Sequence, residues 1–219
     1  MIAERGLEQD EYQLLLCEYA AGTLDEARAL IVAAHASLCA DARASICRYE
    51  QIGGALLQSE CPPAALSEGC LEKVLAQIDA APDKDPAAGS EPIVIDGINV
   101  PASLKSYLEG CGPWKKRLPG METKEIPTEC ANKAQLIRMT PGASSPAHGH
   151  GGQELTLVLD GAFDDEHGRY VRGDLIVLGE HEEHKPVADP QAGCLCLAVS
   201  CAPIKLKGWG AVLNPFLRT

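Results

Sequence analysis

The sequence is poor in aromatic residues and in positive charge. Phe, Trp and Tyr make up 4% of its 219 residues, and 19 Lys and Arg stand against 31 Asp and Glu, which gives a net charge of −12. An acidic chain is repelled by the phosphate backbone, which argues against non-specific binding to nucleic acid. If the protein acts on transcription, we expect it to do so by contacting another protein.

Long apolar runs are also missing. A helix that crosses a bilayer needs roughly eighteen or more consecutive apolar residues, and the sequence has no such run. The first residues include the charged Glu4, Arg5 and Glu8 in place of the apolar segment of a signal peptide. We therefore expect a cytoplasmic protein without membrane contact.

The ten cysteines include no Cys-x-x-Cys pair, and their spacing is irregular. In a reducing compartment such cysteines are free thiols that act as ligands, redox groups or small buried side chains. Cys194 and Cys196 form a Cys-x-Cys pair on one face of a predicted strand. Two interpretations stay open for them: oxidisable thiols beside a metal site, or structural burial.

The stretch from His148 to Glu154 carries most of the chemical information. His148 and His150 are separated by one residue, so their side chains point to the same side of an extended strand. A glycine pair then bends the chain, and Glu154 begins an apolar run. His184 follows thirty residues later and can add a fourth donor from another strand. Three imidazoles and a carboxylate suit Zn²⁺, Fe²⁺, Mn²⁺ or Ni²⁺, so we predict a metal site here.

The complete pattern is Gly142-x5-His148-x-His150-x3-Glu154-x6-Gly161 with His184 downstream. It resembles the metal signature of the cupin superfamily, which implies a small antiparallel β-barrel with the metal at its mouth. Short apolar runs separated by turn residues over residues 93–205 fit a closed barrel or jelly roll. Asp160-Gly161 is expected to be one of the turns.

The first 80 residues instead have the apolar spacing of helices. One predicted helix covers residues 11–21 and ends at Gly22; Thr23, with Glu26 three residues on, predicts a capping box for the next. Residues 81–92 have the composition of a flexible linker. We therefore predict four parts, listed in order: a helical domain (1–80), a linker (81–92), a cupin domain (93–205) and a tail (206–219).

The segment Tyr19-Ala20-Ala21-Gly22-Thr23-Leu24-x-Glu26-Ala27, followed by His35-x3-Cys39, resembles the start of ChrR-type zinc-binding anti-sigma factors. That family joins a helical anti-sigma domain to a C-terminal cupin, and the resemblance covers nearly the whole chain. It implies an α+β multidomain protein that sequesters an extracytoplasmic-function sigma factor. It also implies release when the metal-bound cupin senses an oxidant such as singlet oxygen.

The family's N-terminal zinc motif, His-x3-Cys-x2-Cys with a further upstream His, is incomplete in this sequence. Ala42 stands at the position of the last cysteine, and Asp10 stands at the position of the upstream histidine. Asp10, His35 and Cys39 would give three ligands for a second Zn²⁺, whereas a structural zinc usually has four. Helices held together by packing alone are the alternative.

A different class of function is a cupin metalloenzyme, such as a dioxygenase or an isomerase of a small molecule. The same four ligands would serve it, because one fold supports many reactions. An enzyme would also need a side chain beside the metal that anchors substrate, and Arg138, Arg169 and Tyr170 are the nearest candidates. A storage or scaffold cupin is a third possibility. The attached helical domain favours the regulator.

Overall fold

The computed structural model describes residues 6–81, 93–95, 97–180, 182–202 and 204–206. The predicted linker beyond Ala81 and the predicted tail beyond Leu206 therefore lie outside the described residues. No single described helix has the length and apolar composition to cross a membrane. Two consecutive helices, Glu26–Leu38 and Ala40–Glu60, would qualify only as a joined pair, and the chain bends by 119° between them.

The N-terminal part is helical, as the sequence predicted. Its helices are α1 (Gly6–Ala20), α2 (Glu26–Leu38), α3 (Ala40–Glu60) and α4 (Cys70–Ala80). The predicted capping residue of α2 was wrong: Asp25 is the N-cap, and its Oδ1 accepts a hydrogen bond from the Arg28 backbone N–H at 3.2 Å. The Thr23 hydroxyl donates instead to the Glu18 carbonyl in the last turn of α1, so it is not free to cap α2.

The C-terminal part is almost entirely β-structure. A short 3-10 helix η1 (Ala102–Leu104) and α5 (Lys105–Glu109) interrupt it. The strands are β1 (Ile93–Ile95), β2 (Ile98–Val100), β3 (Lys115–Leu118), β4 (Met121–Ile126), β5 (Lys133–Met139), β6 (His148–His150), β7 (Glu154–Asp165), β8 (Gly168–Val171), β9 (Leu175–Leu178), β10 (Glu183–His184), β11 (Val187–Ala188), β12 (Cys194–Ser200) and β13 (Ile204–Leu206).

The strands pair antiparallel, which confirms the predicted fold class. In the described residues, β10, β6 and β13 form a three-stranded sheet, and the order β11-β7-β12-β5-β4-β3 forms the main path of an eight-stranded sheet. Strands β8 and β9 also pair with β7. Among the described strands the hydrogen-bonded ladders divide into separate sheets, so the predicted barrel is not continuously closed there.

The predicted turn at Asp160-Gly161 was wrong, because both residues lie inside the long strand β7. The pairing of β7 with β12 shifts register between Leu195 and Cys196, which is a β-bulge. Gly161 adopts φ +67° there, and a Cβ atom would lie 2.2 Å from the Gly193 carbonyl oxygen. Glycine thus lets the strand bend without ending.

The helices and the main sheet share one apolar core. Leu15, Leu30 and Ile31 of α1 and α2 belong to the same buried cluster as Leu157 of β7 and Leu197 of β12. The opposite faces of β7 and β12 contribute to a second buried cluster. Because the first cluster crosses the predicted boundary between residues 80 and 93, the division into domains stays a prediction.

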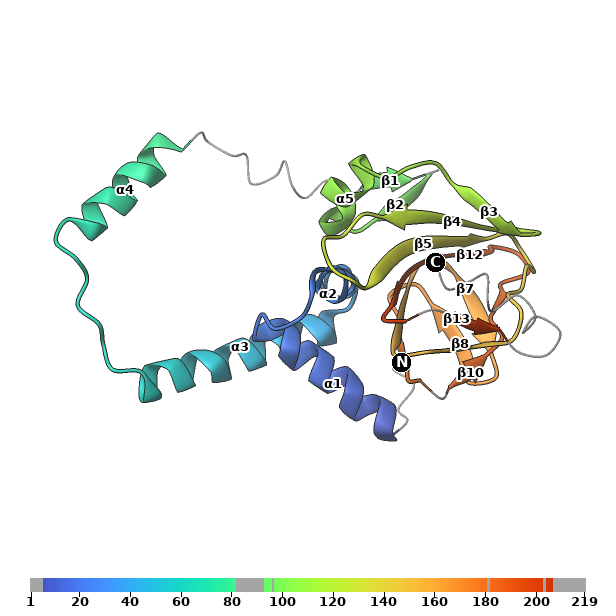
Figure 1. Cartoon of the computed structure of the whole chain (residues 1–219), viewed down its shortest axis with the longest axis horizontal. Helices are drawn as coiled ribbons and strands as arrows, with labels where there is room; N and C mark the ends of the chain where they lie inside the picture. Colours follow the sequence, from blue (N-terminus) through green and yellow to red (C-terminus); the bar gives the residue numbers. More distant parts are fainter. Residues whose placement is uncertain (1–5, 82–92, 96, 181, 203, 207–219) are drawn as a thin grey trace.

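Helix α4 and the second half of α3 lie outside this core. Figure 1 shows α3 extending away from the sheets and α4 standing apart from them. No described residue of α4 is buried. These two segments therefore gain little stability from the rest of the chain.

Candidate metal centre

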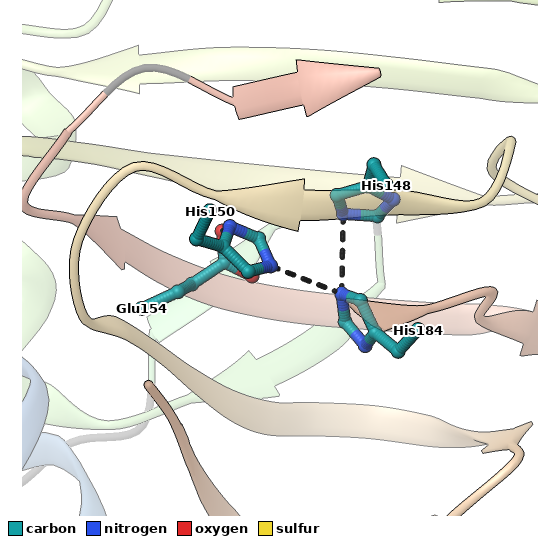
Figure 2. A group of neighbouring side chains, drawn as sticks. All are labelled: His148, His150, Glu154 and His184. Atoms are coloured by element: carbon teal, nitrogen blue, oxygen red, sulfur yellow. Dashed lines mark hydrogen bonds and ion pairs between the residues drawn. The ribbon is translucent and has the colours of Figure 1, made fainter. Parts of the chain in front are cut away.

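Three strands bring the four predicted ligands together. His148 and His150 lie on β6, Glu154 is the first residue of β7, and His184 ends β10 (Figure 2). The antiparallel pairing of β10 with β6 sets His184 directly opposite His148. All four side chains are buried. The alternation of β6 explains why both of its histidines reach the same interior.

The nitrogens of the three imidazoles converge. The Nε2 atom of His184 lies 3.1 Å from Nε2 of His148 and 3.4 Å from Nε2 of His150. One ligand atom from each of these residues and from Glu154 all lie within 4.8 Å of one another. Nitrogen ligands 2.0–2.1 Å from a tetrahedral zinc are about 3.3 Å apart, so the cluster fits a bound metal ion.

The second nitrogen of two of these histidines has a partner that fixes the ring. Nδ1 of His148 donates to the Pro146 carbonyl at 2.8 Å, and Nδ1 of His184 donates to Asp165 Oδ2 at 3.4 Å. In a neutral imidazole this leaves Nε2 unprotonated and available as a ligand. The Nδ1 atom of His150 is 3.0 Å from Glu154 Oε2 but lacks the alignment of a hydrogen bond.

The charges of the cluster also suit a cation. Burial would raise the pKa of Glu154, but the three neighbouring imidazoles, His150 foremost, outweigh it and hold the pKa of this carboxyl below its ordinary value. Two hydroxyls, those of Thr156 and Ser200, donate to the same carboxylate at 3.2 Å. Burial lowers the pKa of His148. A charged carboxylate and a neutral imidazole are the forms that bind metals.

Cys194 and Cys196 lie beside this interior. They are alternate residues of β12, both buried, and their Sγ atoms are 3.3 Å apart. The hydrogen bond with Cys194, together with burial and the nearby charge of Glu154, raises the pKa of Cys196 well above its ordinary value. The Cys196 side chain is therefore held as a thiol, which reacts more slowly than a thiolate.

Comparison with known proteins identifies the family. Residues 111–202 match the family described as ChrR Cupin-like domain. The chain is 40% identical over 210 residues to the anti-sigma-E factor ChrR of Cereibacter sphaeroides, and the match spans 93% of this chain and 95% of that protein. This chain belongs to the ChrR family of anti-sigma factors. The match includes the helices as well as the cupin.

A solved structure supports the same assignment. The crystal structure of Rhodobacter sphaeroides SigE in complex with the anti-sigma ChrR matches with a TM-score of 0.69 and 39% identity. The match covers 86% of this chain and 96% of the other. The sequence thus correctly predicted membership of the ChrR family and the order of its two structural parts.

The structure does not assemble the second metal site predicted from the ChrR resemblance. Asp10 is exposed, Cys39 is partly buried at the end of α2, and Ala42 packs in the core. His35 Nε2 accepts a hydrogen bond from the Tyr12 hydroxyl at 2.8 Å. Within the described parts of the chain, the cupin cluster is the only group of three or more side chains placed to share a metal.

The other nitrogen of His35 joins the helices to the sheets. Its Nδ1 donates to the Gly173 carbonyl, between β8 and β9, at 3.0 Å. Both nitrogens of the neutral ring are therefore engaged, which gives no support to His35 as a zinc ligand. The sequence missed this contact because Tyr12 is only one member of an apolar helical stripe and Gly173 is a turn residue.

The candidate substrate anchors have partners outside the metal cluster. Arg138 pairs with Glu122 at 2.6 Å and lies over the ring of Trp114. Arg169 pairs with two aspartates, Asp164 and Asp189. Tyr170 packs against Phe163, with ring centroids 5.0 Å apart. Their placement gives no support to an anchoring role in an enzyme, and the ChrR family assignment favours the regulator.

Proposed function

We propose that this member of the ChrR family binds an extracytoplasmic-function sigma factor in the cytoplasm and keeps it from RNA polymerase. An oxidant such as singlet oxygen, sensed through the cupin, would release it. The ChrR relative is described as an anti-sigma-E factor, and the matching crystal structure contains SigE. The observation in this chain that carries the proposal is the uncovered apolar surface of α3 and α4.

Helix α4 presents an apolar stripe that stays exposed in the part of the chain that the structure describes. Its members, Leu71, Val74, Leu75 and Ile78, have the spacing i, i+3, i+4 and i+7 and are between 46% and 63% exposed. Such a stripe normally faces a core. An amphipathic helix of this kind is suited to lie against the apolar groove or helix of a partner protein.

The second half of α3 repeats this pattern. Ile52, Leu56 and Leu57 lie within one and a half turns of the helix and are each more than half exposed. Apolar surface gathered in this way marks an interaction site more often than scattered exposed residues do. Together, the two segments offer two apolar helical faces on which a partner such as a sigma factor can pack.

We propose that the metal of the cupin is Zn²⁺, held by His148, His150, Glu154 and His184. When bound, the ion would supply a fixed positive charge and a coordination centre that an oxidant can alter. Fe²⁺, Mn²⁺ and Ni²⁺ suit the same donors. The proposal includes no second zinc in the helical part, because both nitrogens of His35 are already engaged.

The thiol pair offers the sensor a second chemical change. Cys194 and Cys196 belong to the apolar cluster on the metal side of the sheet. We propose that the sensed oxidant is reduced there as it oxidises one thiol to a polar sulfenic acid, or both thiols to a disulfide, and that either product disturbs the packing of β12. Because the other face of β12 packs against the helices through Leu197, a shift of this strand would reach α2 and the first part of α3, from which the proposed sigma-binding surface continues.

The sigma-binding proposal is tested with full-length protein and the sigma factor co-expressed and purified together. Leu75→Asp places a charge in the α4 stripe and is expected to weaken binding at least tenfold without changing the melting temperature of the free protein. Lys73→Asp, on the opposite face of α4, is the matched control and should bind normally. Equal binding by Leu75→Asp and wild type would reject the α4 surface as the site.

A further inference from the structure

Asp165 ends strand β7 beside the metal centre, although it is not one of the four predicted ligands. Its Oδ2 atom accepts the hydrogen bond from Nδ1 of His184. We propose that Asp165 is a positioning residue, which holds the His184 ring so that Nε2 faces the metal. This inference rests on the proposed metal centre and adds a residue to it.

The carboxylate of Asp165 is itself firmly held. Its Oδ1 atom accepts hydrogen bonds from the backbone N–H groups of His167 at 2.7 Å and Gly168 at 3.1 Å. The two oxygens thus have separate partners: Oδ1 binds the turn between β7 and β8, and Oδ2 binds His184. A carboxylate fixed in this way can orient the imidazole, because the turn prevents it from rotating away.

The contact between Asp165 and His184 is buried, which indicates that it is a fixed part of the folded structure. The side chain of Asp165 is 0% exposed and that of His184 is 4% exposed. A buried carboxylate is costly unless hydrogen bonds compensate for the lost water, and here a metal-facing histidine supplies one of them. By contrast, the exposed neighbour Asp164 points to Arg169 on the surface.

The chemistry of a histidine between a metal and a carboxylate explains what Asp165 would add. The carboxylate accepts the Nδ1 proton, which selects the tautomer with a free Nε2 and makes that nitrogen a stronger ligand. His148 has only a neutral carbonyl, that of Pro146, at its outer nitrogen. We therefore expect loss of the Asp165 carboxylate to weaken the bond between His184 and the metal more than the bonds between the metal and the other three ligands.

The test uses full-length Asp165→Asn. Asparagine keeps an oxygen that can accept from the two backbone N–H groups, but its NH₂ group cannot accept the proton of His184. Affinity for Zn²⁺ is measured by competition with a coloured chelator, and coordination is followed by the absorption spectrum of the Co²⁺ form. We expect Asp165→Asn to bind Zn²⁺ about 10- to 100-fold more weakly, with an altered Co²⁺ spectrum.

The control is Asp164→Asn, which makes the same chemical change one residue earlier on β7 and should leave affinity and spectrum unchanged. The metal-free Asp165→Asn protein should melt at the wild-type temperature. Wild-type affinity and spectrum in Asp165→Asn would overturn this inference alone. So would weaker binding with an unaltered spectrum and a lower melting temperature of the metal-free protein. A wild-type protein that binds neither Zn²⁺ nor Co²⁺ would overturn the proposed metal centre as well.

Discussion

At the residue scale, the role of each histidine depends on the partners of its two ring nitrogens. In His148, Nδ1 donates to a backbone carbonyl and Nε2 faces two other imidazoles. In His35, Nδ1 also donates to a backbone carbonyl, but Nε2 meets a tyrosine hydroxyl. The first histidine is left with a nitrogen for a metal, and the second is not.

His148→Ala should remove most of the metal from the full-length protein, because a site with one ligand fewer binds the ion much less tightly. Metal per chain is measured by elemental analysis after dialysis. Glu183→Gln is the control, since this exposed residue precedes His184 on β10 but does not face the cluster. An unchanged metal content in His148→Ala would show that the four residues are not one site.

At the element scale, α2 is anchored to the β-structure at both of its ends. Near its N-terminus, the Asp25 cap accepts a hydrogen bond from Asn132 at 2.9 Å, and Glu26 accepts one from the Tyr107 hydroxyl at 3.0 Å. Near its C-terminus, His35 donates to Gly173. These polar contacts and the shared apolar core hold the first helices on the sheet. Helix α4, by contrast, has no buried residue among those described.

Tyr12→Phe should destabilise the protein by about 1–3 kcal/mol, because the buried Nε2 of His35 would lose its donor. The free energy of unfolding is measured by urea denaturation. Tyr49→Phe is the control: its hydroxyl donates to Gln13 in a partly exposed position, and we expect a smaller loss, about 0.5–1 kcal/mol. If Tyr12→Phe is no less stable than Tyr49→Phe, the His35 contact is not a significant anchor.

At the scale of the whole molecule, the described residues form a well-packed body and two helical segments whose apolar faces are exposed. The body contains α1, α2, the first part of α3 and the sheets in contact with one another. The exposed stripes belong to the rest of α3 and to α4. This distribution lets a partner cover α3 and α4 while the proposed sensor stays folded, and it predicts that stability depends on the buried groups of the body.

Acidification should destabilise the metal-free protein between pH 7.5 and 5.5. Burial lowers the pKa of His35 and of His148 below 6.5, so the folded state resists protonation more than the unfolded state does. Their contribution to stability is complete above pH 6.5 and decreases as the pH falls towards the folded-state pKa values. Carboxyl groups whose pKa is lowered in the folded protein also contribute to stability, but they lose this contribution only in more acidic solution. Asp189, with a pKa of about 2, is an example.

The measurement is the urea midpoint at both pH values in the presence of a chelator. His35→Gln has one titrating group fewer, and its midpoint should change less with pH than that of wild type. An equal midpoint at pH 7.5 and 5.5 in the wild-type protein would contradict the prediction.

Much of this protein could be predicted from its sequence because the decisive signals are local. Alternation along a strand puts His148 and His150 on one side, and the glycine pair returns the chain so that Glu154 joins them. The structure brings these side chains and His184 together as expected, whereas the binding of a metal stays a prediction. The order of helical part and cupin, and the ChrR family, were also evident from short motifs.

Only the tertiary structure decided the roles of His35 and Asp165 and the position of the α2 cap. His35 meets a carbonyl 138 residues away, and Asp165 meets an imidazole 19 residues away on a different strand. The thiol of Cys130, 105 residues after Asp25, joins the contacts around the cap. Hydrogen bonds of this kind depend on how whole elements dock, and they leave no periodic pattern in the sequence that could reveal them.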